Sequence, residues 1–191
     1  MHQSAQRIAG RVGTVPAACG SVRVVCVDGP AGSGKTTLAD RLAGALGPAP
    51  VPVVHMDDLY EGWEQDLAEL GSRVRAWLLD AWAAGLPGRH LRYDWAAGRY
   101  SAWVSVPADP VIILEGCASA SARIRERASL VVWVEAPLAV RTERGLARDG
   151  EAMAPDWRRW QRREAAHFAA DATRAAADVV IDGRTGRIAA D

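Results

Sequence analysis

The sequence predicts an α/β fold in which helices cover both faces of a five-stranded parallel sheet, giving three layers. Short apolar runs rich in valine and isoleucine alternate with segments of helical periodicity, a pattern typical of parallel strands joined by crossover helices. The predicted strands are residues 22–27, 51–56, 111–114, 130–134 and 179–181. A glycine-rich loop joins the first strand to a helix. With 191 residues, the chain is long enough for one domain that buries about 70% of its unfolded surface.

The chain divides into residues 1–20, a helix and a connector, and residues 21–191, the main domain. Residues 4–13 carry Ile8, Ala9 and Val12 at helical spacing before Gly13, which predicts a short amphipathic helix. Residues 16–20 form the connector. The pattern does not indicate what this helix does.

The glycine-rich loop has the phosphate-binding pattern G-x-x-x-x-G-K-S/T. Glycines allow backbone N–H groups to surround an anion closely, and the helix that follows adds its N-terminal dipole. Lys35 is the only lysine among the 23 lysine and arginine residues, and it occupies the position where a compact ammonium reaches the β- and γ-phosphates. The residues expected to bind a nucleotide are Gly29, Ala31, Gly32, Ser33, Gly34, Lys35, Thr36 and Thr37.

Composition narrows the classes of partner. The formal net charge is zero, which argues against nucleic acid or an anionic membrane as the main partner and favours a small molecule. Cys19, Cys26 and Cys117 show no C-x-x-C spacing, so we expect a reducing, cytoplasmic setting without leader or membrane span. Assembly into a homo-oligomer stays open.

Carboxylates follow two of the predicted strands. Asp57 and Asp58 come after the second strand and Glu115 after the third, and ligands of open α/β sheets collect at these carboxyl ends. We expect Asp57 to act as the base that orients an acceptor hydroxyl, and Thr36 and Glu115 to hold Mg²⁺. The alternative for Asp57 or Asp58 is an N-cap of the next helix. His55 is interpreted as a packed side chain.

A hairpin is predicted to interrupt the α/β rhythm. A helix with a wide apolar face spans residues 63–84, and residues 87–106 then form two aromatic stretches around a small turn. Such an insertion beside a phosphate loop suits an acceptor pocket, with Tyr60, Arg92 and Tyr93 as candidate contacts. The alternative is a hairpin that only covers the sheet edge.

The last third of the chain predicts an arginine-bearing lid at about residues 141–165. Arg141, Arg144 and Arg148 share one helical face, and Arg144 and Arg148 are expected to stabilise the transferred phosphoryl group, the alternative being a solvated surface. Trp157 and Trp160 are interpreted as core anchors. The turn at residues 182–186 is a candidate resting place for a nucleotide base.

With these residues in view, the chain resembles the uridine kinase group of P-loop kinases over about residues 20–187. Five elements carry the resemblance: the phosphate loop, Asp57-Asp58-Leu59-Tyr60, Tyr93-Asp94-Trp95, Leu114-Glu115-Gly116, and Arg144 to Asp149. The resemblance implies the strand order 2-3-1-4-5, Asp57 as base, Tyr93 on the acceptor, Glu115 assisting Mg²⁺, and Arg144 and Arg148 closing over the phosphates. Gly98 departs from the family, which has a base-contacting histidine there.

These observations predict a P-loop kinase domain that uses ATP and Mg²⁺ as cofactors. It would transfer the γ-phosphoryl group to a hydroxyl of a small molecule, with a uridine- or cytidine-like nucleoside as the first candidate acceptor. A second hypothesis is a kinase of another small alcohol, such as a sugar, vitamin or antibiotic. A third, from a different class, is an ATP-binding switch protein that transfers nothing.

Overall fold

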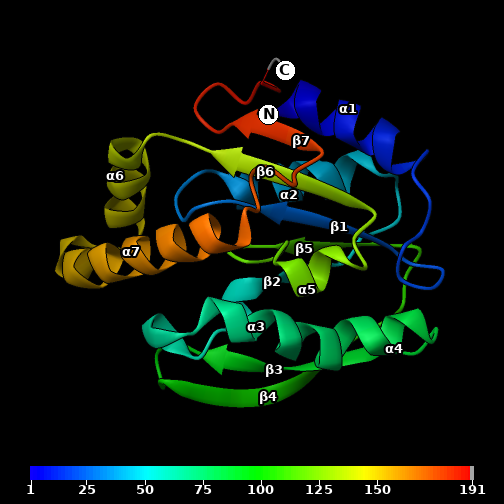
Figure 1. The fold of residues 1–191 in the computed structure, drawn as a ribbon, viewed down its shortest axis with the longest axis horizontal. Helices are drawn as coiled ribbons and strands as arrows, with labels where there is room; N and C mark the ends of the chain where they lie inside the picture. The colour runs from blue at the N-terminus through cyan, green and yellow to red at the C-terminus, as the bar shows by residue number, and fades with distance from the viewer. Residues whose placement is uncertain (190–191) are drawn as a thin grey trace.

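The computed structural model describes residues 1–189 and contains a five-stranded parallel sheet at its centre (Figure 1). The strands lie in the order β2-β5-β1-β6-β7, which is the predicted order 2-3-1-4-5 when only the strands of this sheet are counted. They are β1 (Arg23–Asp28), β2 (Val53–His55), β5 (Val111–Glu115), β6 (Leu130–Glu135) and β7 (Val179–Asp182).

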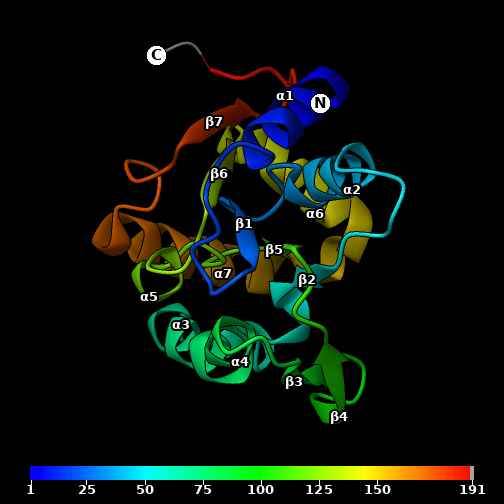
Figure 2. The same ribbon diagram turned by 90° about the vertical axis from the view of Figure 1, so that its right-hand side faces the viewer.

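Successive strand residues point to opposite faces of the sheet, and each face has its own apolar core. On one face Val25 and Val27 pack with α1 (His2–Val12) and α2 (Lys35–Ala45). On the other, Val24 and Cys26 pack with α3 (Leu67–Val74), η3 (Arg75–Leu79), α4 (Asp80–Ala83), α5 (Ala122–Arg125) and α7 (Ala154–Asp171). Figure 2 shows these helical layers on either side of the strands, which confirms the predicted three-layer fold.

Two predicted boundaries move for local reasons. The second strand begins at Val53, because Pro52 precedes it, and it gives way to the 3-10 turn η1 (Met56–Asp58). The helix predicted from residue 63 begins at Leu67, where the Asp66 carboxylate caps it by accepting from the Ala68 N–H at 2.8 Å. Trp63 lies instead in a separate turn, η2 (Gly62–Glu64).

The predicted hairpin forms a sheet of its own, with β3 (Gly88–Asp94) antiparallel to β4 (Arg99–Val106). It packs on the α3–α4 layer: the Trp82 indole donates to the Val106 carbonyl at 3.1 Å, and Trp77 contacts Tyr100 and Trp103 edge to face. The hairpin therefore extends one layer rather than pairing with the edge of the central sheet.

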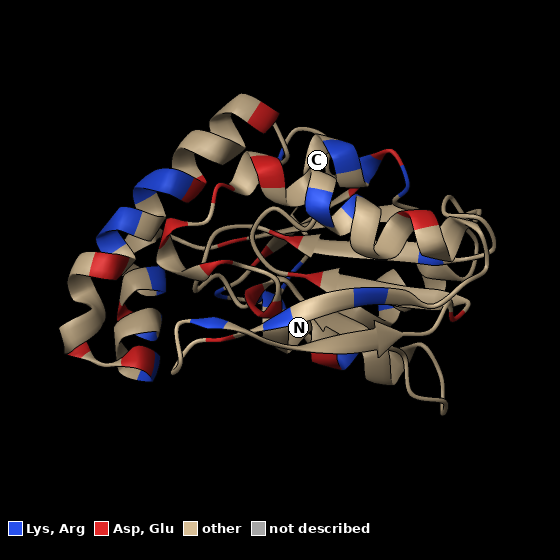
Figure 3. Cartoon of the chain, turned by 90° about the horizontal axis from the view of Figure 1, so that it is seen from below, with Lys and Arg blue, Asp and Glu red and all other residues tan. Residues whose placement is uncertain are grey.

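The N-terminal helix α1 shares the core of the main domain. Ala5, Ile8 and Val12 are buried in the same cluster as α2 and the strands, and Arg11 donates to the Asp178 carbonyl at 2.9 Å. Among the described residues, no helix combines the length and apolarity needed to span a bilayer. Basic and acidic side chains are interspersed over the helices (Figure 3).

Helices α6 (Leu138–Asp149) and α7 meet where Gly145 faces Trp157, and η4 (Glu151–Met153) connects them. A Cβ atom on Gly145 would lie 2.1 Å from Cζ2 of Trp157, a side chain that is only 1% exposed. The missing side chain therefore lets the two helices pack closely.

We predict that Gly145→Ala lowers the free energy of unfolding by about 1–3 kcal/mol, because overpacking outweighs the better helix propensity of alanine. Gly10→Ala is the matched control: a Cβ there meets nothing within 4 Å, so it should gain up to about 1 kcal/mol. Urea denaturation followed by circular dichroism measures both, and equal effects would contradict the packing argument.

Candidate active site

The phosphate loop lies between β1 and α2 and packs against its neighbours through glycines. Gly29 and Gly32 have φ angles of 138° and 76°, in a region that side chains disfavour. A Cβ on Gly29 would lie 2.1 Å from the Val134 carbonyl oxygen, and one on Gly32 would lie 2.5 Å from the Arg141 carbonyl oxygen. The loop is therefore held against β6 and α6.

Lys35 lies at the first turn of α2 and is 7% exposed. Its Nζ donates to the Pro30 carbonyl at 3.0 Å and lies 3.8 Å from the Cys117 sulfur. Burial alone would lower the pKa of Lys35, but the acidic groups around it, Cys117, Glu115 and Glu164, raise it. The side chain is therefore a cation at neutral pH and lies beside the loop.

Thr36 and Glu115 meet at the base of the cavity, where the Thr36 hydroxyl donates to Glu115 Oε1 at 3.2 Å. His55 Nδ1 lies 2.7 Å from Glu115 Oε2, and this hydrogen bond raises the pKa of His55. The His55 side chain is 40% exposed and belongs to neither apolar core cluster, so it contacts the site instead of packing in the core as predicted. Among residues 1–189, no three His, Cys, Asp or Glu side chains form a metal cluster. A hydroxyl and one carboxylate fit Mg²⁺, which takes its other ligands from water and phosphate.

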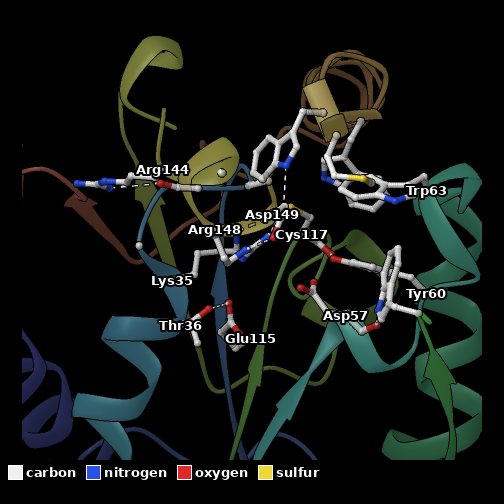
Figure 4. Close-up of a pocket in the computed structure, with 18 of the residues that line it drawn as sticks. Lys35, Thr36, Asp57, Tyr60, Trp63, Glu115, Cys117, Arg144, Arg148 and Asp149 are labelled. Carbon is white, nitrogen blue, oxygen red and sulfur yellow. Dashed lines mark hydrogen bonds and ion pairs between the residues drawn. The ribbon is translucent and has the colours of Figure 1, made fainter. Parts of the chain in front are cut away.

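Asp57 lies in η1 on the opposite side of the cavity from Lys35 (Figure 4). Its main-chain carbonyl accepts from the Trp95 indole at 3.0 Å, whereas Asp58 pairs with Arg92 at 3.4 Å. Solvent in the cavity reaches Asp57, yet desolvation by the surrounding protein, followed by the charge of Glu115, raises its pKa. Neither aspartate caps the next helix, a role that Asp66 takes.

One cavity of about 820 Å³ joins these groups. Of the residues predicted for the site, those that line it are Ala31, Gly32, Gly34, Lys35, Thr36, Thr37, Asp57, Tyr60, Glu115, Arg144 and Arg148. Gly29, Ser33, Arg92 and Tyr93 do not line it. Tyr93 instead contacts Trp95 edge to face at 5.3 Å, and it therefore supports a residue that does.

Apart from Tyr60, the aromatic residues that line the cavity, its aromatic wall, were not predicted as site residues. Trp63, Trp95, Trp157 and Trp160 all line the cavity, together with Tyr60. Trp63 is central to the wall, with its ring 5.5 Å from Trp95, 6.5 Å from Trp157 and 6.1 Å from Trp160. Trp157 and Trp160 are buried, as core anchors should be, and they also present one side to the cavity. The high tryptophan content, eight in 191 residues, was the feature of the sequence that could have indicated an aromatic wall.

The two predicted lid arginines point in different directions. Arg148 forms a two-pronged ion pair with Asp149 at 2.7 and 3.0 Å and lies over the Trp157 ring. Arg144 extends away from Asp57 (Figure 4), donating to the carbonyls of Gly32, Ser33 and Gly183 at 3.1–3.4 Å. Arg148 is therefore the arginine that faces the carboxylates of the cavity.

A buried ion pair fastens the lid helices to the loop. Glu164 of α7 is 1% exposed, and its Oε1 accepts from Arg141 of α6 at 2.7 Å. Its Oε2 accepts from the Ala31 N–H at 2.8 Å. The lid is thus anchored at its base beside the phosphate loop.

Asp28, another residue that sequence reasoning did not single out, is fully buried at the end of β1. Its carboxylate accepts from the N–H groups of Gly29, Ala118 and Ala120 at 2.6, 3.0 and 2.8 Å. Burial raises its pKa from 3.8 to about 7, although these donors and Lys35 oppose the shift.

The comparisons with known proteins identify the fold. No protein-family model matches the sequence, and no curated protein matches it. The fold is similar to a "possible uridine kinase" from Bacillus stearothermophilus, with a TM-score of 0.67 and 22% identity over 93% of this chain and 97% of that one. It is also similar to a "putative fructose transport system kinase" from Silicibacter sp. TM1040, with a TM-score of 0.58 and 21% identity over 87% and 94%. The chain thus has a P-loop kinase fold.

We predict that Asp28→Ala lowers the free energy of unfolding by on the order of 3 kcal/mol at pH 5, since it leaves three buried N–H groups unpaired. Asp28→Asn keeps one acceptor and should lose less. The folded-state pKa lies above the unfolded one, so the folded wild type loses stability as pH rises towards 7, and the deficit of the alanine variant should shrink. Urea denaturation at pH 5 and pH 7 measures this, and a deficit that grows would refute it.

Proposed function

We propose that this protein is an ATP-dependent phosphotransferase that transfers the γ-phosphoryl group to a hydroxyl of a small molecule. The observation that carries the proposal is the position of Asp57 opposite Lys35 and the phosphate loop in one cavity. Phosphoryl transfer requires the acceptor and the donor phosphate to meet in line, with a carboxylate on one side and cations on the other. The kinase fold of the structural neighbours supports the same reaction class.

In this proposal the donor phosphates rest on the backbone N–H groups of the loop, and Lys35 neutralises their charge. Thr36 and Glu115 would hold Mg²⁺, which, when bound, adds further neutralisation of the phosphate oxygens. Arg148 lies on the same side as the carboxylates and could exchange its pairing with Asp149 for the migrating group. Asp57 accepts the proton of the acceptor hydroxyl, so that the acceptor oxygen attacks the γ-phosphorus as the bond from that phosphorus to the ADP leaving group breaks.

The residues at the acceptor end of the cavity, the end beside Asp57, favour an uncharged, planar acceptor. Tyr60, Trp63 and Trp95 line it next to Asp57 and Asp58, whereas the cations that line the cavity are Lys35, Arg144 and Arg148. Rings of this kind stack on planar groups. Of the described residues, Arg92 reaches this end, but it is paired with Asp58 and does not line the cavity, so it is not free to bind a phosphate that the acceptor already carries. A pyrimidine nucleoside fits this description. A sugar is the second candidate, because the neighbour named as a fructose transport system kinase has the same fold.

We predict that Asp57→Asn lowers kcat by at least about 100-fold with the best acceptor, because the base is lost, while the Kd for ATP stays within about twofold. ADP release with a panel of nucleosides and sugars, together with calorimetric titration of ATP, measures both. Asp58→Asn is the matched control, since Asp58 pairs with Arg92. Unchanged turnover in the Asp57 variant would favour the switch-protein hypothesis.

The pH dependence provides a separate prediction. Asp57 works as a base only when ionised, and its pKa is raised above the usual 3.8. Thus kcat/KM for the acceptor should fall with decreasing pH along an acid limb placed above pH 3.8. Because the Arg148 charge lowers the pKa of Asp57, Arg148→Met should move this limb to higher pH. A limb that stays in place in the variant would count against the assignment of Asp57.

A further inference from the structure

The N-terminal helix α1 reaches the far side of the phosphate loop, away from the acceptor end. A methyl group on Gly34 would lie 3.3 Å from Met1 Cε, 3.7 Å from the Gly183 carbonyl oxygen and 3.8 Å from Arg144 Nη1. Three segments far apart in the sequence therefore converge on one glycine of the loop. Figure 1 shows the beginning of α1 beside β7.

A buried hydrogen bond holds α1 against the turn that follows β7. The Ser4 hydroxyl, in a side chain only 6% exposed, donates to the Gly186 carbonyl at 2.6 Å. Gly186 has a φ of 71°, and a Cβ there would lie 2.0 Å from the Met1 nitrogen. Position 186 therefore has no room for a side chain against Met1, and the two segments pack closely.

The same region is the end of the cavity opposite Asp57. Gly34 and Arg144 line the cavity there, and the Arg144 guanidinium is fixed by three carbonyls yet remains exposed to solvent. Arg184 and Thr185 at the tip of the turn are exposed as well. A donor whose phosphates occupy the loop must place its ribose and base outside the acceptor end.

We propose that Met1, at the start of α1, forms one wall of the subsite for the nucleobase of the donor and thereby sets its affinity. The proposal rests on the proposed function, because it takes the phosphate loop as the triphosphate site. The thioether of Met1 provides a polarisable contact for an aromatic base, and the planar guanidinium of Arg144 can stack on it. Ser4 acts as a positioning residue that holds the turn at the correct distance.

The test compares ATP with inorganic tripolyphosphate, which carries the phosphates without a base. Ser4→Ala should raise the Kd for ATP by about three- to tenfold, because one buried hydrogen bond that positions the subsite is lost. The Kd for tripolyphosphate should change by less than about twofold. Gly10→Ala, on the exposed side of the same helix, should alter neither value. Equal loss for both ligands would overturn the proposal.

A second measurement on the wild-type chain does not depend on the folding of a variant. Saturating ATP should slow peroxide oxidation of Met1 by about threefold or more, whereas saturating tripolyphosphate should not; peptide mass spectrometry separates Met1 from Met56 and Met153. If both ligands bind and neither protects Met1, the proposal that Met1 contacts the nucleobase is wrong, whereas the assignment of the phosphate loop as the triphosphate site is retained. If neither ligand binds by calorimetry, the proposed function and this inference both fail.

Discussion

The buried carboxylate of Asp28 is the contact on which the arrangement of the cavity depends. It lies at the end of β1 and accepts hydrogen bonds from the first residue of the phosphate loop and from Ala118 and Ala120 beyond β5. The loop and the end of β5 are thereby held at a constant separation. That separation brings Glu115 to the Thr36 hydroxyl and Cys117 close to Lys35. Burial raises the pKa of Asp28, so ionising this carboxyl group in the folded protein costs free energy.

A second buried carboxylate plays a comparable part on the lid side. Glu164 joins Arg141 to the Ala31 N–H, so α6 and α7 are joined to the loop at their base. Such a pair is weak evidence for added stability, because desolvation offsets much of the attraction. Its geometric effect is clearer, since it determines where the far end of the lid, with Arg148 and Asp149, stands above the cavity. Close packing of Gly145 on Trp157 adds to this constraint.

The hairpin contributes to the cavity through its turn more than through its strands. The Asp94 carboxylate accepts from the Ala96 and Ala97 N–H groups at 3.0 and 2.9 Å, which shapes the turn that carries Trp95. Trp95 then reaches the Asp57 carbonyl and the Trp63 ring. The hairpin therefore supports the proposed base and the aromatic wall at the same time.

Local patterns in the sequence were sufficient to predict the strands, the phosphate loop and the carboxylates at the strand ends. Periodicity and turn chemistry act over a few residues, and a carboxylate that follows a parallel strand must lie at the carboxyl edge of the sheet. The resemblance to uridine kinases supplied the strand order, which the structure confirms.

Contacts between distant segments determine which side chains of a segment face the cavity. Arg144 and Arg148 share a helical face in the sequence, but Arg144 finds three carbonyls that lie far away along the chain. In the same way Trp95, rather than Tyr93, lines the cavity, and α1 meets the loop through Met1. These outcomes depend on contacts between segments that are distant in the sequence or on the shape of one turn, and no local periodicity encodes either.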